Sequence, residues 1–221
     1  MIRKLFFGGL WLIGILYAFR FAPPDRPETL DLIIDLSSGN WAGINPIVIA
    51  LFNLMGVLPF AYGCLLFADG RGQKIGAWPF AAASFGVGAF AILPYLALRQ
   101  PNPHFTGEKN AVLKFWDSRI LGVVLTLVSI VCLVYGFTQG DWADFVTQWQ
   151  TSRFIHVMSL DFCMLCLLVP TLLDDDMARR ELHDRSTFWL AAFVPLLGLL
   201  VYLCLRPPLP ETAEPAVELA S

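Results

Sequence analysis

The stretch Pro46–Phe67 reads PIVIALFNLMGVLPFAYGCLLF and contains no Asp, Glu, Lys, Arg or His. About 20 apolar residues in an α-helix, each rising 1.5 Å, cover the roughly 30 Å of hydrocarbon in a bilayer. A helix is required, because lipid offers no hydrogen-bond partner to the open edge of a sheet. The stretch therefore predicts a transmembrane helix.

Five other stretches have the same character. They are Leu5–Phe21, Trp78–Leu98, Ile120–Phe137, Phe154–Leu173 and Phe188–Leu205. Of the 221 residues, 57% are of hydrophobic types and 15% are charged, which is too little charge to cover a soluble domain of this size. We expect an all-α, six-helix transmembrane bundle. The first stretch follows Arg3 and Lys4 and also fits a signal peptide.

The segments between these helices are of two kinds. Glu28–Trp41 and Asp141–Gln150 mix apolar and charged residues, which predicts short amphipathic helices at the membrane surface. Asp174, Asp175 and Asp176 are consecutive, so their carboxylates would point to different faces of a helix. A solvated helix end is favoured over a magnesium site, which needs converging oxygen ligands.

The two halves of the chain resemble each other. LPYLALRQP at 93–101 recurs as LVYLCLRPP at 200–208, an offset of 107 positions (200 − 93). We predict two three-helix units at 1–101 and 118–208, a linker at 102–117 and a disordered tail at 209–221. Three crossings in each unit would invert the second relative to the first. The Asp69–Lys74 and Asp174–Arg185 loops would then lie on opposite faces. Chance similarity between two apolar sequences is the alternative.

Asp161 is the residue that most strongly indicates function. It lies within an apolar stretch, where an ionised carboxylate is costly, and such residues are often functional. Asn53 occupies the matching position, 108 residues earlier (161 − 53). We expect the two side chains to meet inside the bundle as candidate catalytic residues. An interhelical hydrogen bond that only stabilises packing is the alternative.

Four residues near the predicted membrane surface are candidate ligand-binding residues. His156 is a candidate because imidazole binds pigments and metals as well as forming ordinary hydrogen bonds. Trp41 and Trp149 lie in the amphipathic connectors, on opposite membrane surfaces if the repeat is inverted, and Arg153 can pair with a headgroup or a carboxylate. No protein-metal site and no particular cofactor is predicted. The net charge of −3 and the absence of a basic stripe exclude nucleic acid as a partner.

Several motifs are similar to known sequences. GINP at 43–46, FNLMG at 52–56, AWPF at 77–80 and the stretch Gln148–Phe162 resemble an uncharacterised membrane protein family of cyanobacteria and chloroplasts. That resemblance implies a thylakoid or plasma membrane of a photosynthetic organism, and no particular reaction. FIH at 154–156 and LDF at 160–162 also resemble the neoxanthin-synthase family of plastids, which acts in xanthophyll metabolism. The first half has no counterpart there, so the substrate does not carry over, and His156 and Asp161 are the only positions that do.

Three functions remain open. The first is handling of a hydrophobic isoprenoid or carotenoid-type pigment as an isomerase or cyclase, with Asp161 as general acid and Asn53 orienting the acid or the substrate. The second is a non-catalytic assembly or accessory factor that contacts photosynthetic membrane proteins. The third is a small transporter, as inverted symmetry would suggest. Membrane lipids are expected partners in all three.

Overall fold

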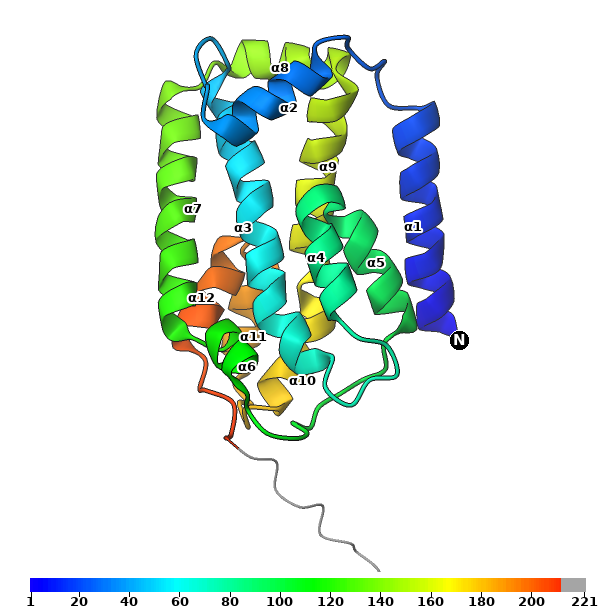
Figure 1. The fold of residues 1–221 in the computed structure, drawn as a ribbon, viewed down its shortest axis with the longest axis vertical. Helices are drawn as coiled ribbons and strands as arrows, with labels where there is room; N and C mark the ends of the chain where they lie inside the picture. The colour runs from blue at the N-terminus through cyan, green and yellow to red at the C-terminus, as the bar shows by residue number, and fades with distance from the viewer. Residues whose placement is uncertain (212–221) are drawn as a thin grey trace, which may run out of the picture.

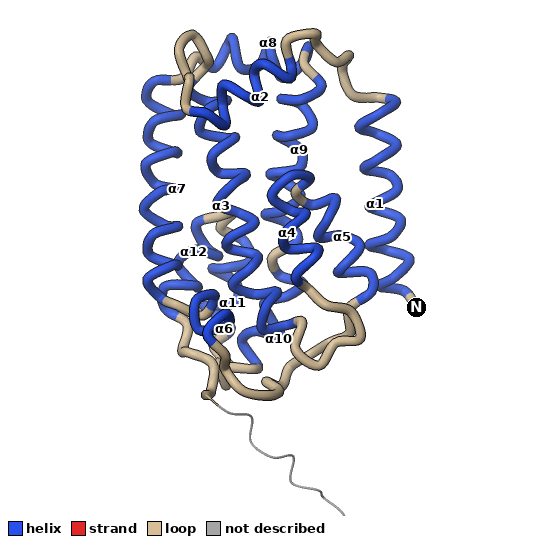
Figure 2. Tube along the Cα trace, in the orientation of Figure 1, coloured by secondary structure: helices blue, strands red, loops and turns tan. Residues whose placement is uncertain are grey.

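The computed structural model describes residues 1–211, which form α-helices joined by loops, with no strand among them (Figures 1 and 2). The helices are α1 (Ile2–Arg20), α2 (Thr29–Ser38), α3 (Pro46–Asp69), α4 (Trp78–Val87), α5 (Ala89–Leu98), α6 (Ala111–Trp116), α7 (Arg119–Gln139), α8 (Trp142–Thr151), α9 (Arg153–Leu168), α10 (Pro170–Ala178), α11 (Arg185–Phe193) and α12 (Leu197–Leu205). Most of the predicted tail lies outside the described residues. Its first part is packed, since Leu209 is buried and its N–H is donated to Asp117.

Four helices are long and apolar enough to cross a membrane: α1, α3, α7 and the continuous pair α9–α10 at Arg153–Ala178. This is consistent with a membrane protein. Local sequence defines where two of them begin. Asn45 caps α3 ahead of Pro46, whose missing N–H suits the first turn of a helix. Ser118 caps α7 in the same way.

The third apolar segment does not form the single long helix that was predicted. It breaks at Gly88, which has φ +51 and ψ −126, a conformation that favours glycine. The helices on either side, α4 and α5, fold back on each other as a hairpin (Figure 1). Ala77 packs on Gly70 just beyond α3, and Arg99 pairs with Asp69 at the end of α3. Both ends of the hairpin therefore lie at the same end of α3.

The sixth segment forms a second hairpin. It breaks between α11 and α12 at residues 194–196, where Leu196 has φ +58. Gly198 packs against the carbonyl of Leu190, because a Cβ at Gly198 would lie 2.2 Å from that oxygen. Arg206 after α12 pairs with Asp176 of α10 at 3.0 Å, and α11 begins shortly after α10 ends. Both ends of this hairpin lie beside the end of α10.

The predicted inverted arrangement is therefore wrong. Each half contains two long helical rods of spanning length and one hairpin, and α1 and α7 run in the same direction (Figure 1). The loops after α3 and after α10 lie together, since Arg179 and Asp69 pair at 3.2 Å. The amphipathic helices α2 and α8 share the other end, where Asn45 contacts Asp144 at 2.7 Å. Trp41 and Trp149 consequently lie at one end of the bundle, not at opposite ends.

The centre of the bundle is α3. Two thirds of its apolar window, 67%, is buried, against 6% for α1 and 22% for α7, so the last two present most of their surface to the surroundings. Gly63 on α3 receives the ring of Trp116 from α6, because a Cβ there would lie 2.4 Å from that ring. The α4–α5 hairpin packs between α3 and α1 and so positions its tip beside α9.

Candidate functional site

Asp161 on α9 lies at the tip of the α4–α5 hairpin. Its Oδ1 accepts a hydrogen bond of 2.8 Å from the backbone N–H of Ala89, the first residue of α5. A helix N-terminus has unpaired N–H groups and a partial positive charge, and a carboxylate complements both. The carboxyl group lies so close to Gly88 that a Cβ there would be 1.6 Å from Oδ2. Glycine at position 88 therefore allows both the backbone conformation of the turn and the close contact with the Asp161 carboxyl group.

The two oxygens of Asp161 have different surroundings. The bond from Ala89 to Oδ1 is the one hydrogen bond that the described residues make with this carboxyl group, and Oδ2 is not among the fully buried side-chain atoms that lack a partner. The residue is 8% exposed, and its neighbour Leu160 is 39% exposed on the outer surface of the bundle. A protonated Oδ2 could donate a proton or a hydrogen bond, and an ionised one could accept.

Asn53 does not meet Asp161 as predicted. Its side-chain amide donates to the carbonyl of Ile49 at 2.8 Å, one turn back on its own helix. This local bond satisfies the amide inside an apolar helix without a partner from another helix. The partner that sequence reasoning missed is the backbone at Gly88 and Ala89, because the break in that segment was not foreseen.

His156 lies between two aromatic rings at the end of the bundle that carries α2 and α8. Its Nδ1 donates to the carbonyl of Trp149 at 3.0 Å, and its Nε2 lies 2.9 Å from the hydroxyl of Tyr17. The imidazole centroid is 4.3 Å from the Trp149 ring and 5.8 Å from the Tyr17 ring. Both ring nitrogens are engaged, so His156 could bind a ligand only if Tyr17 moved away.

The other two candidates make local contacts. Trp41 donates its indole N–H to the carbonyl of Leu36 at 3.2 Å, within its own connector. Arg153 donates from Nε to the carbonyl of Pro23 at 3.1 Å and so joins α9 to the segment after α1. The structure therefore brings Trp149 and His156 together, while Arg153 holds the adjoining chain and Trp41 stays apart.

At the opposite end of the bundle lies a buried cluster of charged residues that sequence reasoning did not predict. Asp69 at the end of α3 accepts hydrogen bonds from the Tyr95 hydroxyl at 2.5 Å and from Arg99 Nε at 2.7 Å. Tyr95 and Arg99 belong to the α4–α5 hairpin. Arg99 also pairs with Asp175 of α10. The cluster joins the C-terminal end of α5 to α3 and to α10.

The same three residue types recur in the second half. Asp176 accepts from the Tyr202 hydroxyl at 2.7 Å and from Arg206 at 3.0 Å. Each member follows its counterpart by 107 positions (176 − 69, 202 − 95 and 206 − 99). The offset was visible in the sequence through the two arginines, so the aspartates and tyrosines could have been found from it. The predicted solvated end at 174–176 is wrong for Asp176, which is fully buried.

Two arginines that directly follow α10 connect the two clusters. Arg179 pairs with Asp69 at 3.2 Å and with Asp176 at 3.5 Å. Arg180 pairs with Asp176 at 2.9 Å and with Asp117 at 2.7 Å. Burial alone would raise the pKa of Asp117, but the charge of Arg180 and further hydrogen bonds hold that pKa below its usual range. Arg179, Arg180 and the aspartates that they contact form ion pairs with one another. The network therefore has a structural role, since it joins the ends of several helices.

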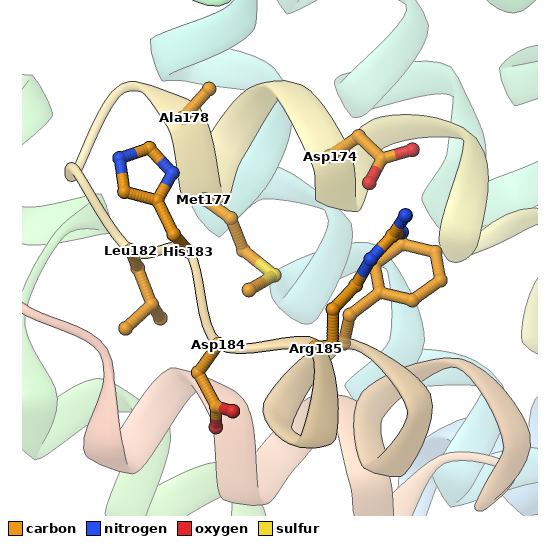
Figure 3. A pocket seen from close by; sticks show the side chains of 8 residues that line it. Asp174, Met177, Ala178, Leu182, His183, Asp184 and Arg185 are labelled. Carbon is orange, nitrogen blue, oxygen red and sulfur yellow. The ribbon is translucent and has the colours of Figure 1, made fainter.

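A small polar pocket of about 180 Å³ lies at the turn between α10 and α11 (Figure 3). Asp174 and Met177 line it from α10, and His183, Asp184 and Arg185 line it from the turn and the start of α11. Across residues 1–211, no group of three His, Cys, Asp or Glu side chains is arranged to hold a metal ion. Asp161 is not among the residues that line this pocket.

Comparisons with protein-family models, with curated proteins and with solved structures find no match to this chain. The resemblances noted for residues 43–80 and 148–162 stay predictions.

Proposed function

We propose that this protein binds a hydrophobic isoprenoid or carotenoid-type pigment from the membrane and isomerises or cyclises it, with Asp161 as the general acid. The observation that supports this most is the unequal pair of oxygens on Asp161. Oδ1 accepts from Ala89, which orients the carboxyl group, and this is the one hydrogen bond that the described residues make with Asp161, so Oδ2 is left for a substrate. A catalytic acid needs such an arrangement, with one oxygen fixed and the other available to a substrate.

The position of Asp161 also suits an apolar substrate. It lies within a span whose apolar window has a mean hydropathy of 1.9, beside the outward-facing Leu160. Asn53 would not orient the acid, because its amide donates to the carbonyl of Ile49. Its proposed role is limited to contact with the substrate.

We further propose that the halves are repeats in parallel orientation, each with two crossings and one hairpin. The support is the recurrence of the Asp–Tyr–Arg cluster at one offset. A photosynthetic membrane, whether thylakoid or plasma membrane, is proposed on the sequence resemblance alone.

Transport is the second candidate, and the broken helices at 87–89 and 194–196 favour it. Interrupted helices near the middle of a membrane form the sites of many transporters. Against it, both hairpins enter from one end and are locked there by buried ion pairs. The assembly-factor alternative needs no free acid in the bundle, so it predicts that Oδ2 has no role.

Asp161→Asn tests the proposed chemistry. The amide oxygen can still accept from Ala89, so we expect normal protein abundance and a loss of activity of about 10²–10⁴-fold, the usual contribution of a general acid. Isoprenoid and pigment profiling of cells expressing each variant is the measurement. Ser159→Ala on the same helix is the control, since Ser159 bonds only to the carbonyl of Ile155. An unchanged profile in the Asp161→Asn cells at normal abundance would favour the assembly factor.

A further inference from the structure

A second cavity, of about 520 Å³, opens where α1 begins and α5 ends. It lies at the charged end of the bundle, far from α2 and α8 (Figure 1). Its walls are mainly apolar, and two arginines contribute the cationic groups. The lining residues are Ile2, Arg3, Phe6, Phe7, Leu96, Arg99 and Thr171. Because Ile2 is 84% and Phe6 62% exposed, the apolar wall continues onto the outer surface of the bundle.

Arg3 has no acidic partner among the described residues. The charge of Arg99 acts on Arg3 more strongly than the charges of Asp175 and Asp69 do, and both of these carboxylates are already paired with Arg99. Arg99 is only 3% exposed, and its Nη1 makes a single long contact of 3.4 Å with the carbonyl of Thr171. The cavity therefore combines three features. Arg3 has no ion pair among the described residues, Arg99 Nη1 makes only a long contact, and the remaining wall is mainly apolar.

We propose that this cavity is a binding site for an anionic phospholipid. The phosphate would lie between Arg3 and Arg99, and an acyl chain would lie along Ile2 and Phe6 into the hydrocarbon. Guanidinium groups bind phosphate through charge-assisted hydrogen bonds, and basic pockets between membrane helices recognise anionic headgroups. The location at the first turn of a membrane span matches the depth of a headgroup. The site is separate from Asp161 and does not depend on the proposed reaction.

The test uses the full chain purified in detergent, with native mass spectrometry counting bound lipid. Dioleoyl phosphatidylglycerol and dioleoyl phosphatidylcholine are the two probes. We expect one phosphatidylglycerol to be retained under conditions that remove phosphatidylcholine. Arg3→Gln should weaken phosphatidylglycerol retention about tenfold, as expected for the loss of one charged contact. Arg3→Lys keeps the charge and should stay within about threefold of the parent.

Lys4→Gln is the matched control. It removes the same charge from the adjacent position, but Lys4 is exposed and does not line the cavity, so retention should not change. Equal losses in the two glutamine variants would overturn the proposal, because attraction to the whole helix end would then explain binding. Equal retention of both lipids would also overturn it. Displacement of the lipid by millimolar inorganic phosphate would indicate a site for free anions and not for lipid. A melting temperature equal to the parent's excludes misfolding of Arg3→Gln.

Discussion

Asp176→Ala is expected to destabilise the protein by about 3–5 kcal/mol, the usual cost of removing one partner from a buried ion pair. Asp176 is fully buried and accepts from Arg180, Arg206 and the Tyr202 hydroxyl. Without it, these buried donors would lose their charged acceptor, and burying a polar group without a partner is costly. For a chain of this size the loss corresponds to a fall in melting temperature of about 10 °C.

The neighbouring aspartate supplies the control. Asp174→Ala removes the same charge two positions away, but Asp174 is exposed at the rim of the small pocket, so we expect a change within about 0.5 kcal/mol. Thermal unfolding of the three proteins in one detergent compares them. Equal melting temperatures for the two variants would contradict the structural role given to the Asp176 cluster.

Gly88→Ala is expected to destabilise the protein by about 2–6 kcal/mol, the sum of two effects. A non-glycine residue at φ +51 and ψ −126 is strained, which costs about 1–3 kcal/mol. The new Cβ would also overlap Asp161, whose Oδ2 would lie 1.6 Å away, and overpacking adds about 1–3 kcal/mol. Gly86→Ala is the matched control in the same segment, because nothing lies within 4 Å of a Cβ at Gly86.

A double variant separates strain from overlap. Asp161→Ala removes the group that Gly88→Ala would strike, so the combined destabilisation should be smaller than the sum of the two single effects by about 1 kcal/mol or more. Unfolding free energies of all four proteins in a double-mutant cycle measure this difference. Strict additivity would mean that Asp161 is not packed against the hairpin tip.

The sequence predicted the helical class and the apolar segments well, because spanning length and low charge leave few alternatives. It did not predict that the segments 78–98 and 188–205 fold back. An unbroken apolar segment and a hairpin of two half-length helices have nearly the same composition, and hydropathy does not distinguish them. Gly88 and Pro195 lie at or within the two breaks, but glycine and proline also occur inside membrane helices. Each of these two segments was counted as one spanning helix. That count predicted the wrong relative orientation of the two halves.

The candidate site was predicted in part. The free-energy cost of placing a carboxylate in an apolar segment was enough to single out Asp161 from the sequence. Its partner was missed because a backbone N–H has no signature in the sequence unless the break that exposes it is recognised. The buried charges at 174–180 were missed for another reason: charged residues after an apolar helix usually face water, and only their partners at Asp69 and Asp117 show otherwise.

The return of both hairpins to one face is the central claim, and single-cysteine labelling in sealed vesicles tests it most directly. With the five native cysteines replaced, Lys74→Cys, His183→Cys and Asn40→Cys report on three exposed loop positions. We predict that an impermeant maleimide labels positions 74 and 183 from the same side and position 40 from the other. Labelling of positions 74 and 183 from opposite sides would contradict the fold and restore the inverted arrangement.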